Sequence, residues 1–265
     1  HGGSGAGPMS FPNLSALAVR ERAVTLFLLL LAVLSGAYVW KFSSELKMMS
    51  PLATGQPVRG VYAVNNEFVN FYLLGGAKNF IAVDAGNDLE MTKKEMNKLG
   101  IDPAAVKAVF LTHTDSDHVA ALPLFPNAKV YLSRDEEQMV NGKTGRFLMF
   151  KNSLPHEHQQ LDDGGTVIVG GFRVKGISTP GHTPGSMSYL VNDALLFSGD
   201  TMSLKDGKAE PFNEFFNMDT EREKDSIKVL AGLKGIRYIF TAHYGFTADP
   251  AKAFKKFASS LRSLQ

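Results

Sequence analysis

The sequence of 265 residues predicts an α/β fold in which two β-sheets are sandwiched between helices, with a separate hydrophobic helix near the N-terminus. Three observations lead to this prediction. Short apolar runs separated by turn residues indicate strands, and each group of strands is followed by a segment with helical spacing. This order of strands and then helix occurs twice, which is typical of two layers that pack against each other. One long uncharged run stands apart from both.

The N-terminal segments carry signals of processing and of a membrane. Residues 1–8, with the sequence HGGSGAGP, resemble a vector remnant. Residues 23–40 are an uncharged run of 18 residues, about the shortest helix that crosses a hydrocarbon core of roughly 30 Å. Arg20 and Arg22 precede this run, so the positive-inside tendency places residues 9–22 in the cytoplasm and the rest of the chain outside it.

Two other interpretations of residues 23–40 stay open. The two arginines could form the basic region of a signal peptide that is cleaved at Ser35-Gly36-Ala37, which would release a secreted or periplasmic protein. A buried core helix is the third possibility, although such runs are usually shorter and more interrupted. We predict a membrane anchor, with the domain that follows it in the periplasm or at the cell surface.

Composition excludes several classes of protein. With 44% hydrophobic and 20% charged residues, the chain is an ordinary globular protein. Its net charge of +2 is too small and too scattered to indicate nucleic-acid binding. There is no cysteine, which excludes disulfides, thiolate nucleophiles and cysteine-bound zinc. Nothing in the composition indicates an oligomeric state.

A folded domain is predicted over residues 61–265, after a polar linker at 41–60 that contains Pro51, Gly55 and Pro57. The first half of the domain is expected to contain strands at 61–64, 68–74, 80–83 and 106–111, a turn at Gly75-Gly76, and a helix at 88–99. The second half is expected to contain hairpins at 166–177 and 186–197, helices at 220–233 and 250–264, and a strand at 238–241.

The strongest chemical signal lies directly after the predicted strand at 106–111. There the sequence reads Thr-His-Thr-Asp-Ser-Asp-His, with four possible metal ligands within six residues. Side chains at alternating positions of a strand-end loop can converge on one point, and imidazole with carboxylate suits zinc, iron or manganese. A polar turn with an accidental cluster is the alternative. The four candidates are His113, Asp115, Asp117 and His118.

Three further candidate ligands follow predicted apolar strands. His182 lies in Ser-Thr-Pro-Gly-His-Thr-Pro-Gly, where prolines and glycines fix a loop that presents the ring. Asp200 follows Leu-Phe-Ser-Gly, and His243 follows Phe-Thr-Ala. One such histidine alone would more often be an ordinary loop residue, but the set together indicates a metal site.

These residues resemble the motif of the metallo-β-lactamase superfamily, His-x-His-x-Asp-His followed by a later His, Asp and His. The resemblance covers about residue 61 to the C-terminus and implies a four-layer αβ/βα sandwich with two metal ions. Asp84, in Ala-Val-Asp-Ala-Gly, matches an early aspartate of the family that supports the ligand loop. By resemblance, one ion is held by His113, Asp115 and His182, and the other by Asp117, His118 and His243, with Asp200 between them.

One position departs from the family's pattern, because Asp115 stands where the second histidine is usual. A carboxylate there still binds a metal, but its negative charge weakens the first ion as a Lewis acid and shifts the preference toward iron or manganese. We expect two divalent ions, zinc first, with iron or manganese as alternatives. Such a pair activates a water for attack on a carbonyl or phosphorus, while Asp117 orients the water and relays its proton.

The resemblance implies an enzyme, a metal-dependent hydrolase of a small molecule. The bridging Asp200 resembles that of glyoxalase II-type thioesterases, so an ester, thioester or related bond is expected, cleaved at the membrane surface if the chain is anchored. A β-lactam or phosphodiester bond is the alternative on the same site. An alternative of another class is a flavodiiron-like di-iron oxidoreductase served by a partner flavoprotein, because that group has an acidic residue at the Asp115 position.

Five residues outside the ligand set also stand out. Lys143 and Arg146 lie in the insertion between the ligand motifs, and Tyr244 follows a ligand, so these three are possible substrate-binding residues. His156 and His158 alternate and could form a second metal site, but a solvated loop is the favoured interpretation.

Overall fold

The computed structural model describes residues 14–76, 79–146 and 151–257. The chain divides between Met48 and Met49 into two compact units. The first unit contains one helix, and the second contains all the strands that the structure describes.

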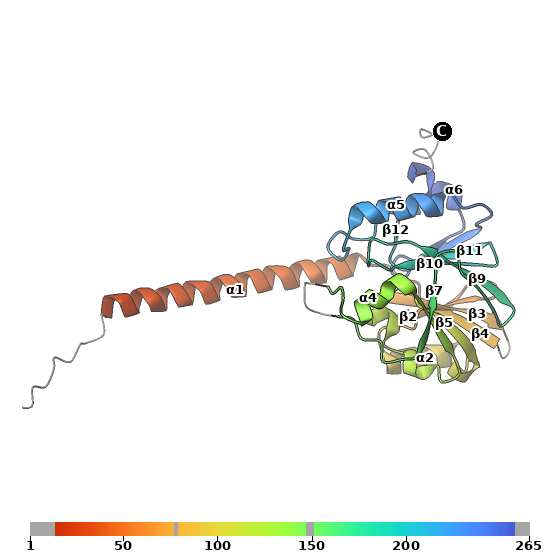
Figure 1. Cartoon of the computed structure of the whole chain (residues 1–265), viewed down its shortest axis with the longest axis horizontal. Helices are drawn as coiled ribbons and strands as arrows, with labels where there is room; N and C mark the ends of the chain where they lie inside the picture. Colours follow the sequence, from red (N-terminus) through yellow and green to blue (C-terminus); the bar gives the residue numbers. More distant parts are fainter. Residues whose placement is uncertain (1–13, 77–78, 147–150, 258–265) are drawn as a thin grey trace, which may run out of the picture. The chain divides into compact units, whose positions relative to one another are not determined.

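The first unit is the helix α1, Leu14–Met48, which is 35 residues long (Figure 1). Residues 24–48 are long and apolar enough to cross a membrane, a test that a signal sequence near the N-terminus also passes. The helix extends beyond the predicted run at 23–40 in both directions. An ion pair between Lys41 and Glu45, one turn apart, supports its continuation. The prediction that a linker begins at residue 41 is therefore wrong.

The later part of the predicted linker at 41–60 is also structured. Strand β1, Gly55–Val58, pairs antiparallel with β2, Val61–Asn66. Just before β1, the amide of Leu52 donates to Asn70 Oδ1 at 2.7 Å, and its carbonyl accepts from Asn70 Nδ2 at 2.9 Å. A side-chain amide from the sheet thus holds the backbone that precedes β1. The compact unit accordingly begins at Met49, twelve residues earlier than predicted, since 61 − 49 = 12.

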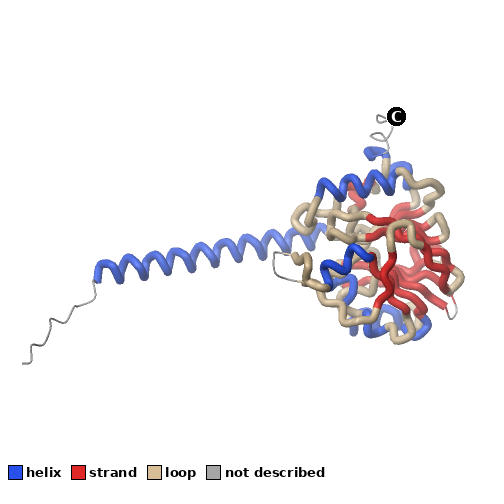
Figure 2. The backbone as a smooth tube through the Cα atoms, in the orientation of Figure 1, coloured by secondary structure: helices blue, strands red, loops and turns tan. Residues whose placement is uncertain are grey.

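Two sheets form the middle of the second unit (Figure 2). The first has seven strands in chain order, antiparallel from β1 to β4 and parallel from β4 to β7. Its later strands are β3 Val69–Gly76, β4 Asn79–Val83, β5 Val106–Phe110, β6 Lys129–Ser133 and β7 His158–Leu161. The second sheet has the order β15-β14-β11-β10-β9-β8. Its strands are β8 Thr166–Val169, β9 Phe172–Ser178, β10 Met187–Val191, β11 Leu195–Phe197, β14 Tyr238–Phe240 and β15 Phe246–Thr247.

The strands contribute side chains to three hydrophobic clusters, because successive side chains of a strand point to opposite faces of its sheet. Along β3, Leu74 belongs to the cluster between the two sheets, whereas Leu73 belongs to the cluster under α2, Leu89–Lys98. A third cluster packs the six-stranded sheet against α5, Thr220–Ala231, and α6, Pro250–Ala253. Figure 1 shows α2 and α5 on opposite outer sides of the sheets. The order helix, sheet, sheet, helix confirms the predicted four-layer α/β sandwich.

Two predicted boundaries differ in the structure. The turn predicted at Gly75-Gly76 is part of β3, where Gly75 pairs with Phe80 at a φ of +152°. A side chain at Gly75 would collide with the neighbouring strand, because its Cβ would lie 2.2 Å from Asn79 O. The helix predicted at 250–264 is interrupted by a turn at Phe254, which packs into the third cluster, and residues 255–257 are helical again. Residues 258–264 of that prediction lie outside the described residues.

Short elements complete the connections near the sheet edges. They are the helices α3 Ser116–Val119 and α4 Glu137–Val140, the 3-10 turns η1 Pro103–Ala105, η2 Leu122–Leu124 and η3 Arg134–Glu136, and the hairpin β12 Ser203–Lys205 with β13 Lys208–Glu210.

Candidate metal centre

The seven candidate ligands meet at one edge of the two sheets. They follow β5 in the first sheet and β9, β11 and β14 in the second. Because β11 and β14 are parallel, their carboxyl ends lie at the same edge. Hydrogen bonds across the sandwich hold the two edges together: Tyr189 Oη donates to Leu111 O and Tyr72 Oη donates to Thr241 O, both at 2.7 Å. The sheets therefore position the ligand loops against each other.

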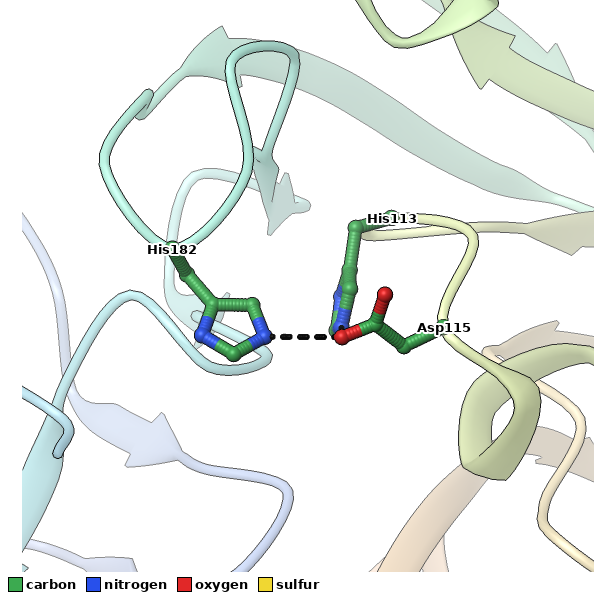
Figure 3. Close-up of side chains that lie close together, drawn as sticks. All are labelled: His113, Asp115 and His182. Atoms are coloured by element: carbon green, nitrogen blue, oxygen red, sulfur yellow. Dashed lines mark hydrogen bonds and ion pairs between the residues drawn. The ribbon is translucent and has the colours of Figure 1, made fainter. Parts of the chain in front are cut away.

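The first group of ligand atoms lies around Asp115 (Figure 3). Its Oδ2 atom is 3.5 Å from His113 Nε2 and 3.1 Å from His182 Nε2. Asp200 approaches the same group, with Oδ2 at 3.5 Å from His182 Nε2 and 3.9 Å from His113 Nε2. Two imidazoles and two carboxylates thus face one point.

The second group lies around Asp117. Its Oδ2 atom is 3.6 Å from His118 Nε2 and 3.4 Å from His243 Nε2. Asp200 also faces this group, with Oδ1 at 3.3 Å from His243 Nε2 and Oδ2 at 3.5 Å from His118 Nε2. The carboxylate of Asp200 therefore lies between the two groups.

The spacing of these atoms fits metal ions. Four ligands at about 2.0–2.1 Å from a tetrahedral ion lie about 3.3–3.4 Å apart, close to the distances found here. In addition, among the residues that the structure describes, His113 Nε2, His118 Nε2 and Asp200 Oδ1 are buried and have no hydrogen-bond partner. Buried polar atoms are costly when they lack a partner, so three orphans directed at one place indicate a ligand. The donor set of imidazole and carboxylate suits zinc.

The other ring nitrogen of each histidine is bound to a protein oxygen. His118 Nδ1 lies 2.9 Å from Asp84 Oδ2, His243 Nδ1 lies 2.7 Å from Phe68 O, and His182 Nδ1 lies 3.2 Å from Asn217 Oδ1. His113 Nδ1 lies 3.1 Å from Thr112 Oγ1, whose own proton goes to Asp84. These contacts hold a proton on Nδ1, so Nε2 is the nitrogen that remains to bind a metal.

Asp84 holds the ligand loop, as the family resemblance implies. Its Oδ1 atom accepts from the backbone amide of Thr112 at 2.8 Å, and its Oδ2 atom faces His118. The residue has a φ of +64°, an unusual value for a residue with a side chain, which such contacts can maintain. Asp84 thereby fixes both the start of the loop and one of its rings.

The centre is strongly polarised by its carboxylates. Burial on its own would lower the pKa of His243, but Asp200 and Asp117 raise it to about 10. Burial likewise opposes the charged form of His118, yet Asp200 and Asp117 raise its pKa well above the ordinary value. Burial would raise the pKa of Asp200, but the charges of His243 and His118 hold it well below its ordinary value. The carboxylates are thus ionised and attract positive charge, whether protons or metal ions.

Sequence reasoning missed Glu136. It is fully buried, and its Oε1 atom accepts from the amide of Thr114 at 2.9 Å and from Thr114 Oγ1 at 2.7 Å. Its Oε2 atom accepts from Thr183 Oγ1 at 2.6 Å. Glu136 therefore connects the loop that carries Asp115 to the loop that carries His182. The only signal was an acidic residue in the run Arg-Asp-Glu-Glu, which is typical of a surface.

The possible substrate-binding residues lie in different surroundings. Arg146 reaches the centre and is hydrogen-bonded to Asp115 and His182. Tyr244 is buried in the third hydrophobic cluster, with its ring centroid 6.0 Å from that of Phe212. Lys143 is exposed, and its backbone amide donates to Asn141 Oδ1 within the same loop.

Aromatic rings surround the histidines of the centre. The ring of Phe212 is 5.2 Å from that of His182 and 5.3 Å from that of His243. Phe68 stacks on His243 with the ring centroids 5.9 Å apart. Phe212 is buried and Phe68 is half-buried, so Phe68 presents apolar surface next to the candidate ligands.

His156 and His158 do not form a second centre among the residues that the structure describes. His158 is paired with Glu137 at 2.8 Å, whereas His156 bonds to the backbone of its neighbour. The solvated loop expected here is wrong for His158, which is half-buried and begins β7.

Comparison with known proteins agrees with this site. Residues 64–243 match the family model described as the metallo-beta-lactamase superfamily. The probable polyketide biosynthesis zinc-dependent hydrolase BaeB of Bacillus velezensis is 34% identical over 128 residues, which are 47% of this chain and 50% of that protein. The uncharacterized protein YobT of Bacillus subtilis is 28% identical over 213 residues, 71% of this chain and 88% of that protein. The chain thus spans about half the length of the first relative.

Solved structures show the same fold. A metallo-beta-lactamase family protein from Thermus thermophilus has a TM-score of 0.58 at 21% identity, covering 78% of this chain and 80% of that one. A metallo-beta-lactamase from Cronobacter sakazakii, described by its HARLDQ motif, has a TM-score of 0.57 at 20% identity, covering 83% and 95%.

Proposed function

We propose that this chain, which belongs to the metallo-beta-lactamase superfamily, is a metal-dependent hydrolase that binds two divalent ions, zinc by preference. The observation that carries the proposal is the pair of ligand groups that share Asp200. One ion would be held by His113, Asp115 and His182, and the other by Asp117, His118 and His243. Relatives described as zinc-dependent hydrolases support zinc.

The ions, when bound, would supply Lewis-acid activation of a water molecule and of the bond under attack. The residues of the chain do the rest. Burial raises the pKa of Asp117, but His118 and His243 outweigh it and lower the pKa below its ordinary value. Asp117 is therefore ionised at neutral pH and can orient the attacking water and take its proton. Asp84 and Phe68 keep the rings of His118 and His243 in place.

The bond that we propose is an ester, thioester or related bond of a small molecule. A protein from Dictyostelium discoideum described as glyoxylase B2 is 30% identical over 142 residues, and a hydroxyacylglutathione hydrolase from Gloeobacter violaceus is 28% identical over 171 residues. The half-buried ring of Phe68, stacked on His243, suits an apolar acyl group. β-Lactams and phosphodiesters are the competing substrates on the same site.

We also propose that α1 anchors the enzyme, with the hydrolase unit outside the cytoplasm. The helix holds an apolar span at residues 24–48, and Arg22 precedes it. Apolar surface of this extent is unfavourable in water, and basic residues favour the cytoplasmic side. The enzyme would then meet its substrates at the membrane surface.

A substrate panel tests the catalytic proposal. Zinc-loaded protein should hydrolyse at least one chromogenic ester or thioester, and Asp117→Asn should lose most of that activity, about 100-fold or more, because a ligand and the proton acceptor are removed together. His156→Ala, which changes a half-buried histidine outside the centre, is the matched control and should retain full activity. An Asp117→Asn variant within a few-fold of the unmodified protein would contradict the assigned role.

A further inference from the structure

Arg146 has an unusual place for a positively charged side chain. Its side chain is only 18% exposed, and Nη2 lies 2.5 Å from Asp115 Oδ2 and 2.8 Å from His182 Nε2. Nε lies 3.0 Å from Asp115 Oδ1, so the guanidinium binds both oxygens of the carboxylate. Nη1 donates to the carbonyl oxygen of Phe216. The guanidinium is thus hydrogen-bonded to Asp115, His182 and Phe216.

The position of Nη2 is incompatible with a metal ion in the first group. A zinc ion bound to Asp115 Oδ2 and His182 Nε2 would lie about 2.0–2.2 Å from each of these atoms. The arginine nitrogen already occupies a hydrogen-bonding position on the same two ligand atoms. The ion and this positively charged group would therefore compete for the same two ligand atoms. The arginine must move before an ion can bind there.

The second group has no such competitor. Among the residues that the structure describes, no lysine or arginine is hydrogen-bonded or ion-paired to Asp117, His118 or His243. Its ligand atoms face each other and Asp200 alone. The two groups therefore differ in the kind of cation they hold. The first contains a guanidinium that stays charged, whereas the imidazoles of the second can lose their protons to make way for an ion.

The arginine also gives a physical reason for the departure at Asp115. A guanidinium presents two parallel N–H groups that match the two oxygens of a carboxylate. An imidazole at position 115 could not accept this fork. Asp115 and Arg146 therefore form a matched pair, 31 residues apart in the chain.

We propose that Arg146 is a built-in cation that competes with the metal for the His113–Asp115–His182 position, so that the two positions fill in sequence. The position of Asp117, His118 and His243 binds its ion first and tightly. The other position binds an ion only when Arg146 leaves Asp115. Breaking a partly buried charge pair costs free energy, and that cost weakens the second binding step. The inference rests on the proposed two-metal function.

Zinc titration of the full chain tests this proposal. Isothermal titration calorimetry and elemental analysis at chelator-buffered zinc concentrations should resolve two binding steps whose dissociation constants differ about 10-fold or more. Arg146→Ala should strengthen the second step about 10-fold or more and leave the first within about three-fold. Lys143→Ala, which removes an exposed cation from the same loop, should change neither step.

A second variant, at Asp115, tests the same competition without changing Arg146. Asp115→His removes the acceptor of the fork and restores a neutral ligand, so it should also bring the two steps closer together. Circular dichroism establishes that each variant is folded. The role of Arg146 would be overturned if the unmodified protein bound two zinc ions with equal dissociation constants. It would also be overturned if Arg146→Ala left the second dissociation constant unchanged or raised it. Either result would leave the two-metal proposal intact. Failure of all the variants and the unmodified protein to bind zinc would overturn the proposed function itself.

Discussion

The site histidines are each held at Nδ1 by a protein oxygen and directed through Nε2 at carboxylates. Because Asp84, Phe68 and Asn217 supply three of these oxygens, the orientation of the rings depends on parts of the chain far from the ligands. The identity of the candidate ligands could be predicted, since each follows an apolar strand. Arg146 was expected near the site as a substrate-binding residue, but its pairing with Asp115, 31 positions away in the chain, could not be predicted. Glu136 was missed because it lies in a polar run that is typical of a surface.

Zinc affinity should rise with pH. The pKa of His243 is raised to about 10 and that of His118 well above its ordinary value, because Asp200 and Asp117 favour the protonated rings. A metal binds the neutral ring, so binding must release these protons. Between pH 6 and 8 we expect the dissociation constant of the first step to fall about 10-fold per pH unit for each proton released. Calorimetry in buffers of different ionisation enthalpy counts the protons, and an affinity that is independent of pH would contradict this account.

Glu223 should make the folded protein less stable as pH rises. Burial raises its pKa to about 8, although hydrogen bonds from Phe212 and Asn217 oppose the shift. An unfolded glutamate has a pKa of about 4.3, so between these values the folded state binds more protons than the unfolded state. Stability is therefore fully present below about pH 4 and is lost as the pH rises through 8.

The variant Glu223→Gln removes this titration. The quantity to measure is the melting temperature of the variant minus that of the unmodified protein, both without metal. This difference should become several degrees more positive between pH 5 and pH 8.5. The other titrating groups of the centre are common to both proteins. A difference in melting temperature that stays constant over this range would show that Glu223 does not titrate in the folded state.

At the scale of elements, the centre depends on close contact between loops. Gly185, in the loop after His182, packs directly on η3: a Cβ there would lie 2.0 Å from the backbone nitrogen of Glu136. The prolines and glycines of the sequence predicted a fixed loop at this place. They could not predict which glycine touches another backbone, because that contact joins residues 49 positions apart, as 185 − 136 = 49. The strands and long helices were predictable because their periodicity is local.

Gly185→Ala should destabilise both the fold and the centre. The added methyl group forces apart the two loops that Glu136 connects, at a cost of about 2 kcal/mol or more. The melting temperature should fall by several degrees, and zinc should bind more weakly. Gly76→Ala is the control, because a Cβ there meets nothing within 4 Å. Equal effects of the two substitutions would exclude the close contact as the cause.

At the scale of the whole molecule, the chain combines a helix with the length of a membrane span and a compact unit that carries all seven candidate ligands. The sequence predicted both parts, but it placed the start of the second at residue 61. Leu52 and β1 belong to the fold through side-chain amides and strand pairing, which the prolines and glycines of that segment concealed.

The anchor leads to a fractionation prediction. The full chain should sediment with membranes and resist extraction by salt or alkaline carbonate, because an apolar helix holds it. A variant that begins at Met49 should be soluble and should still bind zinc, since residues 49–265 form a compact unit. Mass measurement of the N-terminus distinguishes an anchor from a cleaved signal. An intact chain in the soluble cytosolic fraction would contradict both.

Anomalous diffraction from crystals of the zinc-loaded protein tests the two-metal centre most directly. Data collected on both sides of the zinc absorption edge locate each ion without reference to activity. We predict two peaks on either side of Asp200, one among Asp117, His118 and His243 and the other among His113, Asp115 and His182, with Arg146 displaced wherever the second peak is full. A single peak at saturating zinc, or peaks away from these residues, would contradict the account.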